Sequence, residues 1–150
     1  MRSHPRIAVL VAFLVTAAAC SGGPSKEEFI AEADAICAAA EERARDLEPP
    51  TDEAGFVDFA SKLAGISEQS LADLRELEPP DGDEEAVEEL FGTIDDANDA
   101  LVNAIEKRSS GENPAADYQE ALEFSEDASD LAQDYGFDRC GTTPGAETHT

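Results

Sequence analysis

Apolar residues recur every three or four positions through most of the chain, the spacing of one face of an α-helix. The first such stripe lies in residues 26–47 and consists of Phe29, Ala33, Ile36, Cys37, Ala40, Ala44 and Leu47. Ser25 precedes it as a candidate N-cap, and two glutamates follow in the first turn, where the helix dipole favours negative charge. Pro49 and Pro50 end the helix, because the residue before a proline is pushed out of helical geometry.

Two further stripes of the same kind follow. The second begins after Thr51 or Asp52, and its face consists of Phe56, Phe59, Leu63, Ile66, Ser70, Leu74 and Leu77. The third begins after Asp81 or Asp83, and its face consists of Val87, Leu90, Phe91, Ile94, Ala97, Leu101 and Ile105. The tetrapeptide Leu-Glu-Pro-Pro precedes both starts and indicates either an internal duplication or the same helix stop used twice.

The fourth stripe has the clearest boundaries. Asn113 is a candidate N-cap, Pro114 suits the first helical position, and Gly136 suits the end, with a hydrophobic contact from Phe137. Its face consists of Tyr118, Ala121, Leu122, Ser125, Ala128, Leu131, Ala132 and Tyr135. The connections are short and no segment shows the alternation of a strand. We therefore expect an all-α domain over residues 26–140, folded as an antiparallel up-down four-helix bundle.

The start of the chain has a different pattern. Residues 1–6 are short and basic, residues 7–15 form an apolar run, and residues 16–19 are small. This is the layout of a secretory signal peptide over residues 1–19, with an apolar core of about 7–15 residues. The run is shorter than the roughly 20 apolar residues of a membrane-spanning helix. The sequence therefore predicts export from the cytoplasm.

The residues at the cleavage site indicate a lipid anchor. Ala17-Ala18-Ala19-Cys20 resembles the lipobox of bacterial lipoproteins, although that family usually has Leu where this chain has Ala17. The resemblance implies cleavage before Cys20 and a lipid such as palmitate on that cysteine, with residues 20–25 as a flexible tether. The alternative is an ordinary A-x-A cleavage site, which would release a soluble secreted protein.

The chain has three cysteines, an odd number for an exported protein. A lipid on Cys20 would leave Cys37 and Cys140 to pair in a compartment where disulfides persist. In an up-down bundle the end of the fourth helix lies beside the start of the first, so residues 136–140 can reach back to Cys37. We expect one disulfide, Cys37–Cys140, and the alternative is two free buried thiols.

Charge restricts the partners of the protein. Lysine and arginine number 10 against 35 aspartates and glutamates, a formal net charge of −25. Such a charge opposes binding to nucleic acid, which depends largely on lysine and arginine, and opposes lying flat on anionic lipid. The apolar residues fall at helical spacing, so the charge indicates an acidic surface rather than disorder. Many of them are alanine, and we therefore expect a thin core.

Groups for catalysis are scarce in the predicted bundle. The two histidines, His4 and His149, lie in the signal peptide and in residues 141–150, a polar tail for which we expect disorder. The bundle therefore has no histidine for general base catalysis, no zinc spacing and no phosphate-binding loop. The sequence predicts no catalytic residue, no cofactor and no metal site, and a protein that is not an enzyme.

Polar residues remain at two kinds of position. Residues 81–85 (Asp-Gly-Asp-Glu-Glu) suit Ca²⁺ or Mg²⁺, which take oxygen ligands. However, Ala86 and Gly92 stand where an EF-hand loop has Gly and Glu, and a solvated surface or helix cap is the alternative. Asn98 and Ser125 are polar residues near the apolar stripes. We expect them either to form a polar layer in the core or to lie at the edge of a core stripe.

Two segments support the lipoprotein interpretation together with the lipobox. The sequences FIAEADAIC at 29–37 and YGFDRCG at 135–141 resemble small exported lipoproteins of actinobacteria. The resemblance implies a helical domain held by one disulfide. We expect an extracytoplasmic binding or structural module, anchored to the cell membrane through Cys20, that meets a protein or cell-envelope partner. The alternative is an acidic lipoprotein that responds to or buffers divalent cations.

Antiparallel topology also places the connections. Residues 79–85 are expected beside the tether, where their charge would repel anionic lipid and hold the bundle off the membrane. Residues 48–52 and 109–113 are expected at the opposite end, facing partners.

Overall fold

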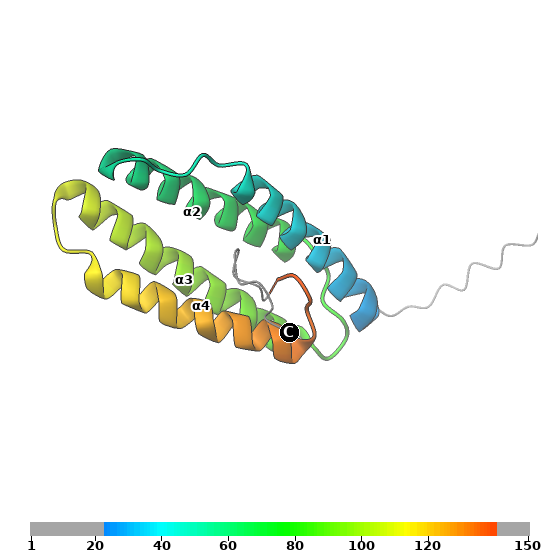
Figure 1. Cartoon of the computed structure of the whole chain (residues 1–150). Helices are drawn as coiled ribbons and strands as arrows, with labels where there is room; N and C mark the ends of the chain where they lie inside the picture. Colours follow the sequence, from blue (N-terminus) through cyan, green and yellow to red (C-terminus); the bar gives the residue numbers. More distant parts are fainter. Residues whose placement is uncertain (1–22, 141–150) are drawn as a thin grey trace, which may run out of the picture.

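The computed structural model describes residues 23–140, which form four α-helices. They are α1 (Lys26–Arg45), α2 (Glu53–Arg75), α3 (Glu84–Ser110) and α4 (Ala115–Tyr135). Successive helices run in opposite directions, and α1 packs on α2, α2 on α3, and α3 on α4 (Figure 1). The predicted all-α up-down bundle with one disulfide is confirmed. The predicted signal peptide, Cys20 and the tail 141–150 lie outside the described residues.

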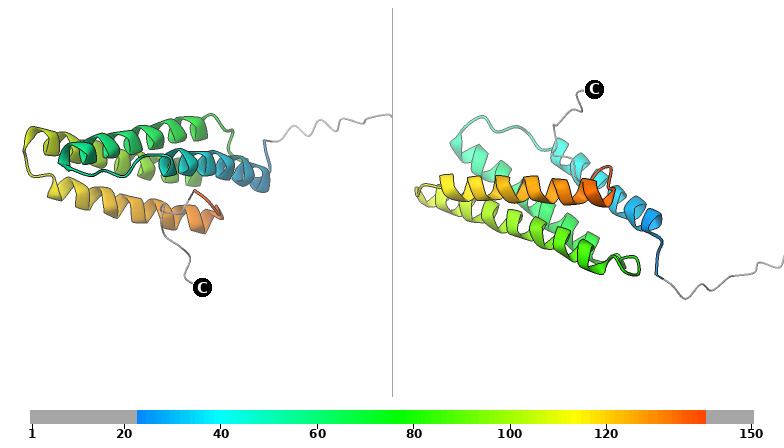
Figure 2. Two further views of the ribbon diagram at one scale, coloured as in Figure 1. Left: turned by 45° about the horizontal axis from the view of Figure 1, so that its top comes forward. Right: turned by 90° about the horizontal axis from the view of Figure 1, so that it is seen from below.

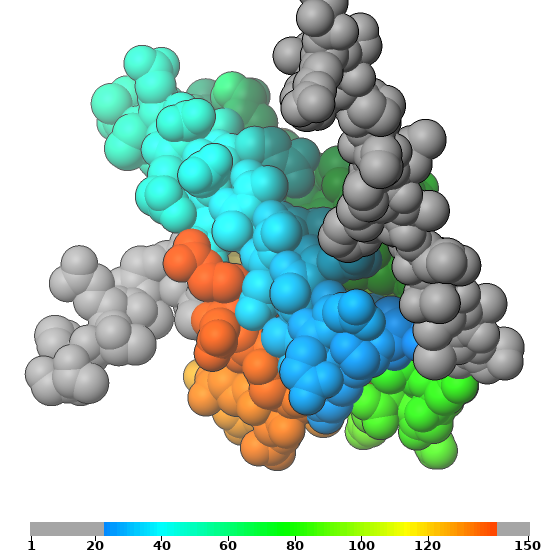
Figure 3. Space-filling model, turned by 90° about the vertical axis from the view of Figure 1, so that its right-hand side faces the viewer, coloured from blue at the N-terminus to red at the C-terminus, as the bar shows by residue number. Residues whose placement is uncertain are grey.

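The first and last helices are joined indirectly. α1 is the shortest helix and ends about halfway along α2 (Figure 1, Figure 2). No Cα atom of α1 lies within 8 Å of one in α4. Residues 136–140, which we call the C-terminal clasp, lie between these two helices instead (Figure 3). The clasp therefore closes the side of the bundle that the helices leave open.

One end of the bundle, which we call the tether end, holds the chain that leads to the N-terminus. Lys26 Nζ in α1 lies 3.9 Å from Asp83 Oδ2 at the start of α3. A Cβ added to Gly23 would lie 3.5 Å from the carbonyl oxygen of Pro79. The loop between α2 and α3 therefore lies beside the start of α1, where antiparallel topology predicts it.

At the opposite end, which we call the far end, α3 makes ion pairs with both of its neighbours. Arg108 is 2.7 Å from Glu53 Oε1 at the start of α2, and its guanidinium lies 4.7 Å from the ring centre of Phe56. Lys107 Nζ is 2.7 Å from Oδ1 of Asp117 at the start of α4. Asp117 is buried, and the sequence did not single it out.

Local hydrogen bonds explain where α1 and α2 begin. Ser25 Oγ accepts the N–H of Glu28 at 3.2 Å, and the Glu28 carboxylate accepts the N–H of Ser25 at 3.0 Å. This reciprocal capping box confirms Ser25 as the N-cap and lowers the pKa of Glu28. Of the two candidates before α2, Asp52 is the cap, and its Oδ1 accepts the N–H of Gly55 at 2.7 Å.

The starts of α3 and α4 differ in part from the prediction. Asp83 precedes α3 but makes no side-chain cap, and its Oδ2 accepts a hydrogen bond from Tyr135 Oη at 2.8 Å. α4 begins at Ala115, one residue after the predicted Pro114. The Asn113 side chain still accepts the Ala115 N–H at 3.1 Å.

The two Leu-Glu-Pro-Pro copies end their helices in the same way. Leu47 N–H donates to the carbonyl of Ala44 at 3.3 Å, and Leu77 N–H donates to that of Leu74 at 3.1 Å. The helices end two residues earlier than expected, at Arg45 and Arg75, because the last turn tightens before the prolines. This shared geometry is compatible with both interpretations of the repeat, an internal duplication and one helix stop used twice.

The core is concentrated at the tether end. Its main cluster draws on all four helices and the clasp, and a smaller cluster of Ala60, Ala64 and Ile105 lies toward the far end. Alanine supplies eight of the sixteen buried hydrophobic residues, so the core is thin. Leu122, which the stripe placed on the core face, is 61% exposed. That prediction is wrong, because α4 turns Ala121 and Ala128 toward the core and leaves Leu122 on its solvent side.

Candidate functional site

The connection between α1 and α2, residues 46–52, is the linker. It follows an extended path alongside α2 to the far end (Figure 1). Pro49 and Pro50 lack backbone donors and have a restricted φ, so this segment cannot continue the helix. Both prolines are exposed, whereas Pro80 in the second copy is buried. The same tetrapeptide is therefore part of a packed loop in one place and of an exposed linker in the other.

The linker is attached to the helices at both of its ends. Its first turn is closed by the hydrogen bond from Leu47 to Ala44, and its last residue, Asp52, caps α2. A Cβ added to Gly55 would lie 3.1 Å from Asp52 Oδ1 and 3.8 Å from Pro50 Cα. Glycine at this position therefore allows the linker to approach α2 closely.

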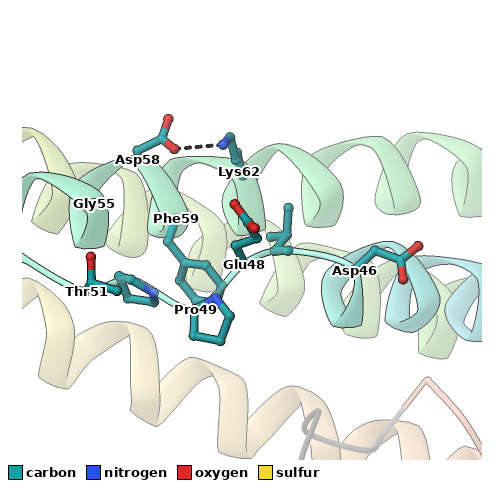
Figure 4. A pocket seen from close by; sticks show the side chains of 10 residues that line it. Asp46, Glu48, Pro49, Thr51, Gly55, Asp58, Phe59 and Lys62 are labelled. Atoms are coloured by element: carbon teal, nitrogen blue, oxygen red, sulfur yellow. Dashed lines mark hydrogen bonds and ion pairs between the residues drawn. The ribbon is translucent and has the colours of Figure 1, made fainter.

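A pocket of about 380 Å³ lies between the linker and the first half of α2 (Figure 4). Phe59 projects from α2 toward the linker and, together with Leu47 and Pro49, supplies apolar lining. Phe59 and Leu47 are only partly buried. The volume lies within the range of about 300–1,000 Å³ that is usual for ligand pockets.

The charged lining residues are three carboxylates and one lysine. Asp58 Oδ2 and Lys62 Nζ, one turn apart on α2, form an ion pair at 2.7 Å (Figure 4). Asp46 and Glu48 on the linker are exposed and have no ion-pair partner within the described part of the chain. The pocket therefore combines an apolar wall with two carboxylates that no internal cation neutralises.

These groups suit binding of a cation with an apolar stem. Aromatic faces attract cations, and carboxylates form strong charge-assisted hydrogen bonds with ammonium and guanidinium groups. The pocket lining contains neither histidine nor cysteine. What the site offers is recognition through charge and apolar contact.

The predicted disulfide is formed between α1 and the C-terminal clasp. Cys37 in α1 and Cys140 in the clasp are bonded, with their Cα atoms 5.2 Å apart. Phe137, expected to pack after the end of α4, is 5% exposed and belongs to the main core cluster. The predicted lipidation residue, Cys20, precedes the described residues.

A carboxylate that the sequence did not single out holds the same clasp. The side chain of Asp34 accepts three backbone N–H groups, from Asp138 at 3.0 Å, Arg139 at 2.8 Å and Cys140 at 3.2 Å. Asp34 lies one helical turn before Cys37, so the covalent and the polar attachment occupy neighbouring turns of α1. The only signal in the sequence is that this carboxylate lies next to the apolar stripe.

Aromatic residues connect the clasp to the tether end. The Tyr135 ring stacks on Phe137 with centroids 5.0 Å apart and meets Phe29 edge-on at 6.1 Å. Lys26 Nζ lies 3.8 Å from the centre of the Tyr135 ring. Burial, together with the hydrogen bond from its hydroxyl to Asp83, raises the pKa of Tyr135 well above its usual value. These side chains at the tether end are therefore used in contacts within the protein.

Residues 81–85 contribute to local structure. Asp83 interacts with Lys26 and Tyr135, and the Glu84 carboxylate accepts the N–H of Gly82 at 2.8 Å. Within residues 23–140, no three or more histidine, cysteine or acidic side chains are placed to hold a metal ion together. The arrangement fits the interpretation of these residues as a solvated helix start.

Asn98 and Ser125 do not form a shared polar layer. Asn98 is 8% exposed, and its Nδ2 has no hydrogen-bond partner among the described residues. Ser125 lies at the surface of α4, where its Oγ donates to the carbonyl of Ala121 at 2.6 Å. Asn98 is thus a core position, and Ser125 is an edge position.

No known protein family, curated protein or solved structure matches the chain. Across residues 23–140, no helix combines the length and the apolar character needed to cross a membrane. The functional argument therefore rests on the geometry described above.

Proposed function

We propose that this protein is a lipid-anchored extracytoplasmic interaction module. In this proposal it is attached to the cell membrane through Cys20 and binds a protein or cell-envelope partner with the linker side of its far half. The observation that supports it is a division of roles along the bundle. The chain from the anchor enters at the tether end, whereas the pocket with unpaired carboxylates lies beside the opposite half.

The tether end is suited to standing near a membrane without binding it. Its aromatic cluster and the Lys26 and Asp83 side chains are used in internal contacts. Asp81, Glu84 and Glu85 in the adjacent loop are exposed. Their charge repels anionic lipid within a Debye length of about 8–10 Å, which would hold the bundle off the surface.

The far half offers the accessible surface for a partner. The linker exposes Pro49 and Pro50, and α4 exposes Leu122.

Site-specific photo-crosslinking on live cells tests this orientation. A photoreactive amino acid at Glu48 on the linker is expected to capture a partner, and the same residue at Glu85 at the tether end is the matched control. Mass spectrometry of the products would also report the lipid on Cys20. Equal capture at both positions, adducts of Glu85 with lipid headgroups, or an unmodified Cys20 would each contradict the proposal.

The cation alternative has a separate test, although no arrangement of the described residues favours it. Calorimetric titration with Ca²⁺ measures it directly, since weak extracellular sites bind at about 0.1–1 mM. Absence of binding in that range would remove this alternative.

A further inference from the structure

We propose that the pocket between the linker and α2 binds a lysine or arginine side chain carried by an exposed segment of a partner protein. This inference rests on the proposed function, in which a partner meets the linker side of the far half. It adds the chemistry of the partner and the residues that recognise it.

The apolar wall of the pocket suits the stem of such a side chain. Phe59 and Leu47 are only partly buried, so their remaining apolar surface faces the pocket and solvent. Lysine and arginine bury their aliphatic stems along apolar surfaces while the charged group stays in contact with polar groups or water. The Phe59 ring adds attraction for a cation placed over its face.

The charges select a cation over an anion. Lys62 is already paired with Asp58, which leaves Asp46 and Glu48 as the charges available to a ligand. The protein as a whole carries a formal net charge of −25, so an acidic segment would be repelled as it approached. A basic segment would be attracted before it made contact.

The shape of the pocket allows a side chain carried by a partner protein to enter from solvent. Its linker wall includes exposed prolines, so it is open to solvent on that side. Pro49 and Pro50 stiffen this wall, and the close approach of Asp52 to Gly55 attaches it to α2. A wall that is already ordered reduces the entropy cost of binding.

The protein uses the same combination internally one turn earlier on α2. The Arg108 guanidinium lies 4.7 Å from the ring centre of Phe56 and 2.7 Å from the Glu53 carboxylate. The pocket at Phe59 also contains carboxylates, those of Asp46, Glu48 and Asp58, but its one lining cation, Lys62, is paired with Asp58. Asp46 and Glu48 are therefore left for a cation supplied by a partner.

The second Leu-Glu-Pro-Pro copy provides an internal comparison. There, Pro80 is buried, and its carbonyl accepts the N–H of Asp83 at 3.0 Å in a tight turn. Glu76 and Glu78 correspond to Asp46 and Glu48, and they are likewise exposed. The same negative charge can therefore be removed either at the pocket, through Asp46 and Glu48, or away from it, through Glu76 and Glu78.

The test is a titration of the full exported chain, ¹⁵N-labelled and solubilised in a neutral detergent, followed by NMR. The ligand is the acetylated, amidated pentapeptide Gly-Leu-Arg-Leu-Gly, and the control peptide has glutamate in place of arginine. We expect shifts confined to the linker and the first half of α2, weaker binding at higher salt, and no binding of the glutamate peptide.

Paired variants identify the residues involved. Asp46→Asn with Glu48→Gln is expected to weaken binding of the arginine peptide about two- to fivefold, since exposed ion pairs contribute only modestly to affinity. Glu76→Gln with Glu78→Gln removes the same charge at the other copy and is expected to leave the affinity unchanged. All four side chains are exposed, so both variants are expected to fold.

Three results would overturn the inference. They are equal loss of affinity in both paired variants, equal binding of the glutamate peptide, and binding of n-butylguanidinium as tight as that of the peptide, which would assign the pocket to small free guanidinium compounds. Capture of a partner at Glu48 on cells, without peptide binding in vitro, would reject this inference and leave the proposed function standing.

Discussion

Asp34 Oδ1 accepts a hydrogen bond from the backbone N–H of Cys140 at 3.2 Å. Asp34 lies one helical turn before Cys37, the residue to which Cys140 is bonded by the disulfide. The carboxylate and the disulfide thus hold the same segment against the same helix. Because α1 and α4 make no close backbone contact, this clasp is an important connection between the first and last helices.

Replacing Asp34 should loosen the clasp while the disulfide stays intact. In Asp34→Asn, the charge is lost and an NH₂ group faces backbone donors. We expect the free energy of unfolding to fall by about 1–3 kcal/mol, measured by urea denaturation. Glu32→Gln, an exposed change on the same helix, should stay within about 0.5 kcal/mol of the parent chain. Equal effects of the two changes would contradict the role assigned to Asp34.

Removing the disulfide should lower stability by a larger amount. The bond joins residues separated by 103 positions, and it restricts the unfolded chain. Cys37→Ser with Cys140→Ser is expected to lower the free energy of unfolding by about 2–4 kcal/mol. Asp34→Asn should then cost less than it does with the bond present, because a clasp without the bond is partly released. Strict additivity in this double-mutant cycle would show that the two attachments act independently.

Alkaline pH should destabilise the protein through Tyr135. Burial and the Asp83 carboxylate raise the pKa of Tyr135 above its ordinary value of 10.0, so folding favours the neutral phenol. The resulting stability is present below about pH 10 and is lost as pH rises further, because the unfolded tyrosine ionises first. Urea denaturation across that pH range should show that the free energy of unfolding declines less steeply with pH for Tyr135→Phe than for the parent chain.

Tyr118→Phe is the control for this pH dependence, and it should keep the decline of the parent chain. Lys26, which lies over the Tyr135 ring, is present in every variant. The same slope in the Tyr135→Phe and Tyr118→Phe proteins would argue against the effect of Tyr135.

Two glycines of α2 should respond differently to alanine. Gly65 is exposed, and a Cβ there would meet nothing within 4 Å, so Gly65→Ala should stabilise the helix by about 0.5–1 kcal/mol. At Gly55 the new Cβ would lie 3.1 Å from Asp52 Oδ1 and disturb a cap worth about 1 kcal/mol. Thermal unfolding should therefore show a gain only for Gly65→Ala. Equal gains would mean that the linker is not held as described.

The helices themselves were predictable because their signals are local. Ser25 and Asp52 act as caps through hydrogen bonds to residues three positions away. The prolines at 49–50 and 79–80 end α1 and α2 through steric effects on the residues just before them. Predictions that needed a neighbouring helix were less accurate. Leu122 lies on a regular stripe, yet it is exposed whereas its neighbour Ala121 is buried.

The candidate site was not predictable, for the same reason. Both Leu-Glu-Pro-Pro copies read alike and close their helices alike, and only the tertiary structure buries Pro80 and leaves Pro49 and Pro50 beside a pocket. The linker's position depends on where α1 stops relative to α2, which no local pattern encodes.

Periodicity, caps and prolines in the sequence therefore determined four antiparallel helices, and the two cysteines after Cys20 indicated which residues would be bonded. The tertiary structure decided that Asp34 holds the clasp, that Asp117 is buried, and that Asp46 and Glu48 remain without cations beside Phe59. The physical reason is the distance along the chain over which each interaction acts. Backbone geometry and capping act over a few residues, whereas burial and charge pairing depend on groups that only the folded chain brings together.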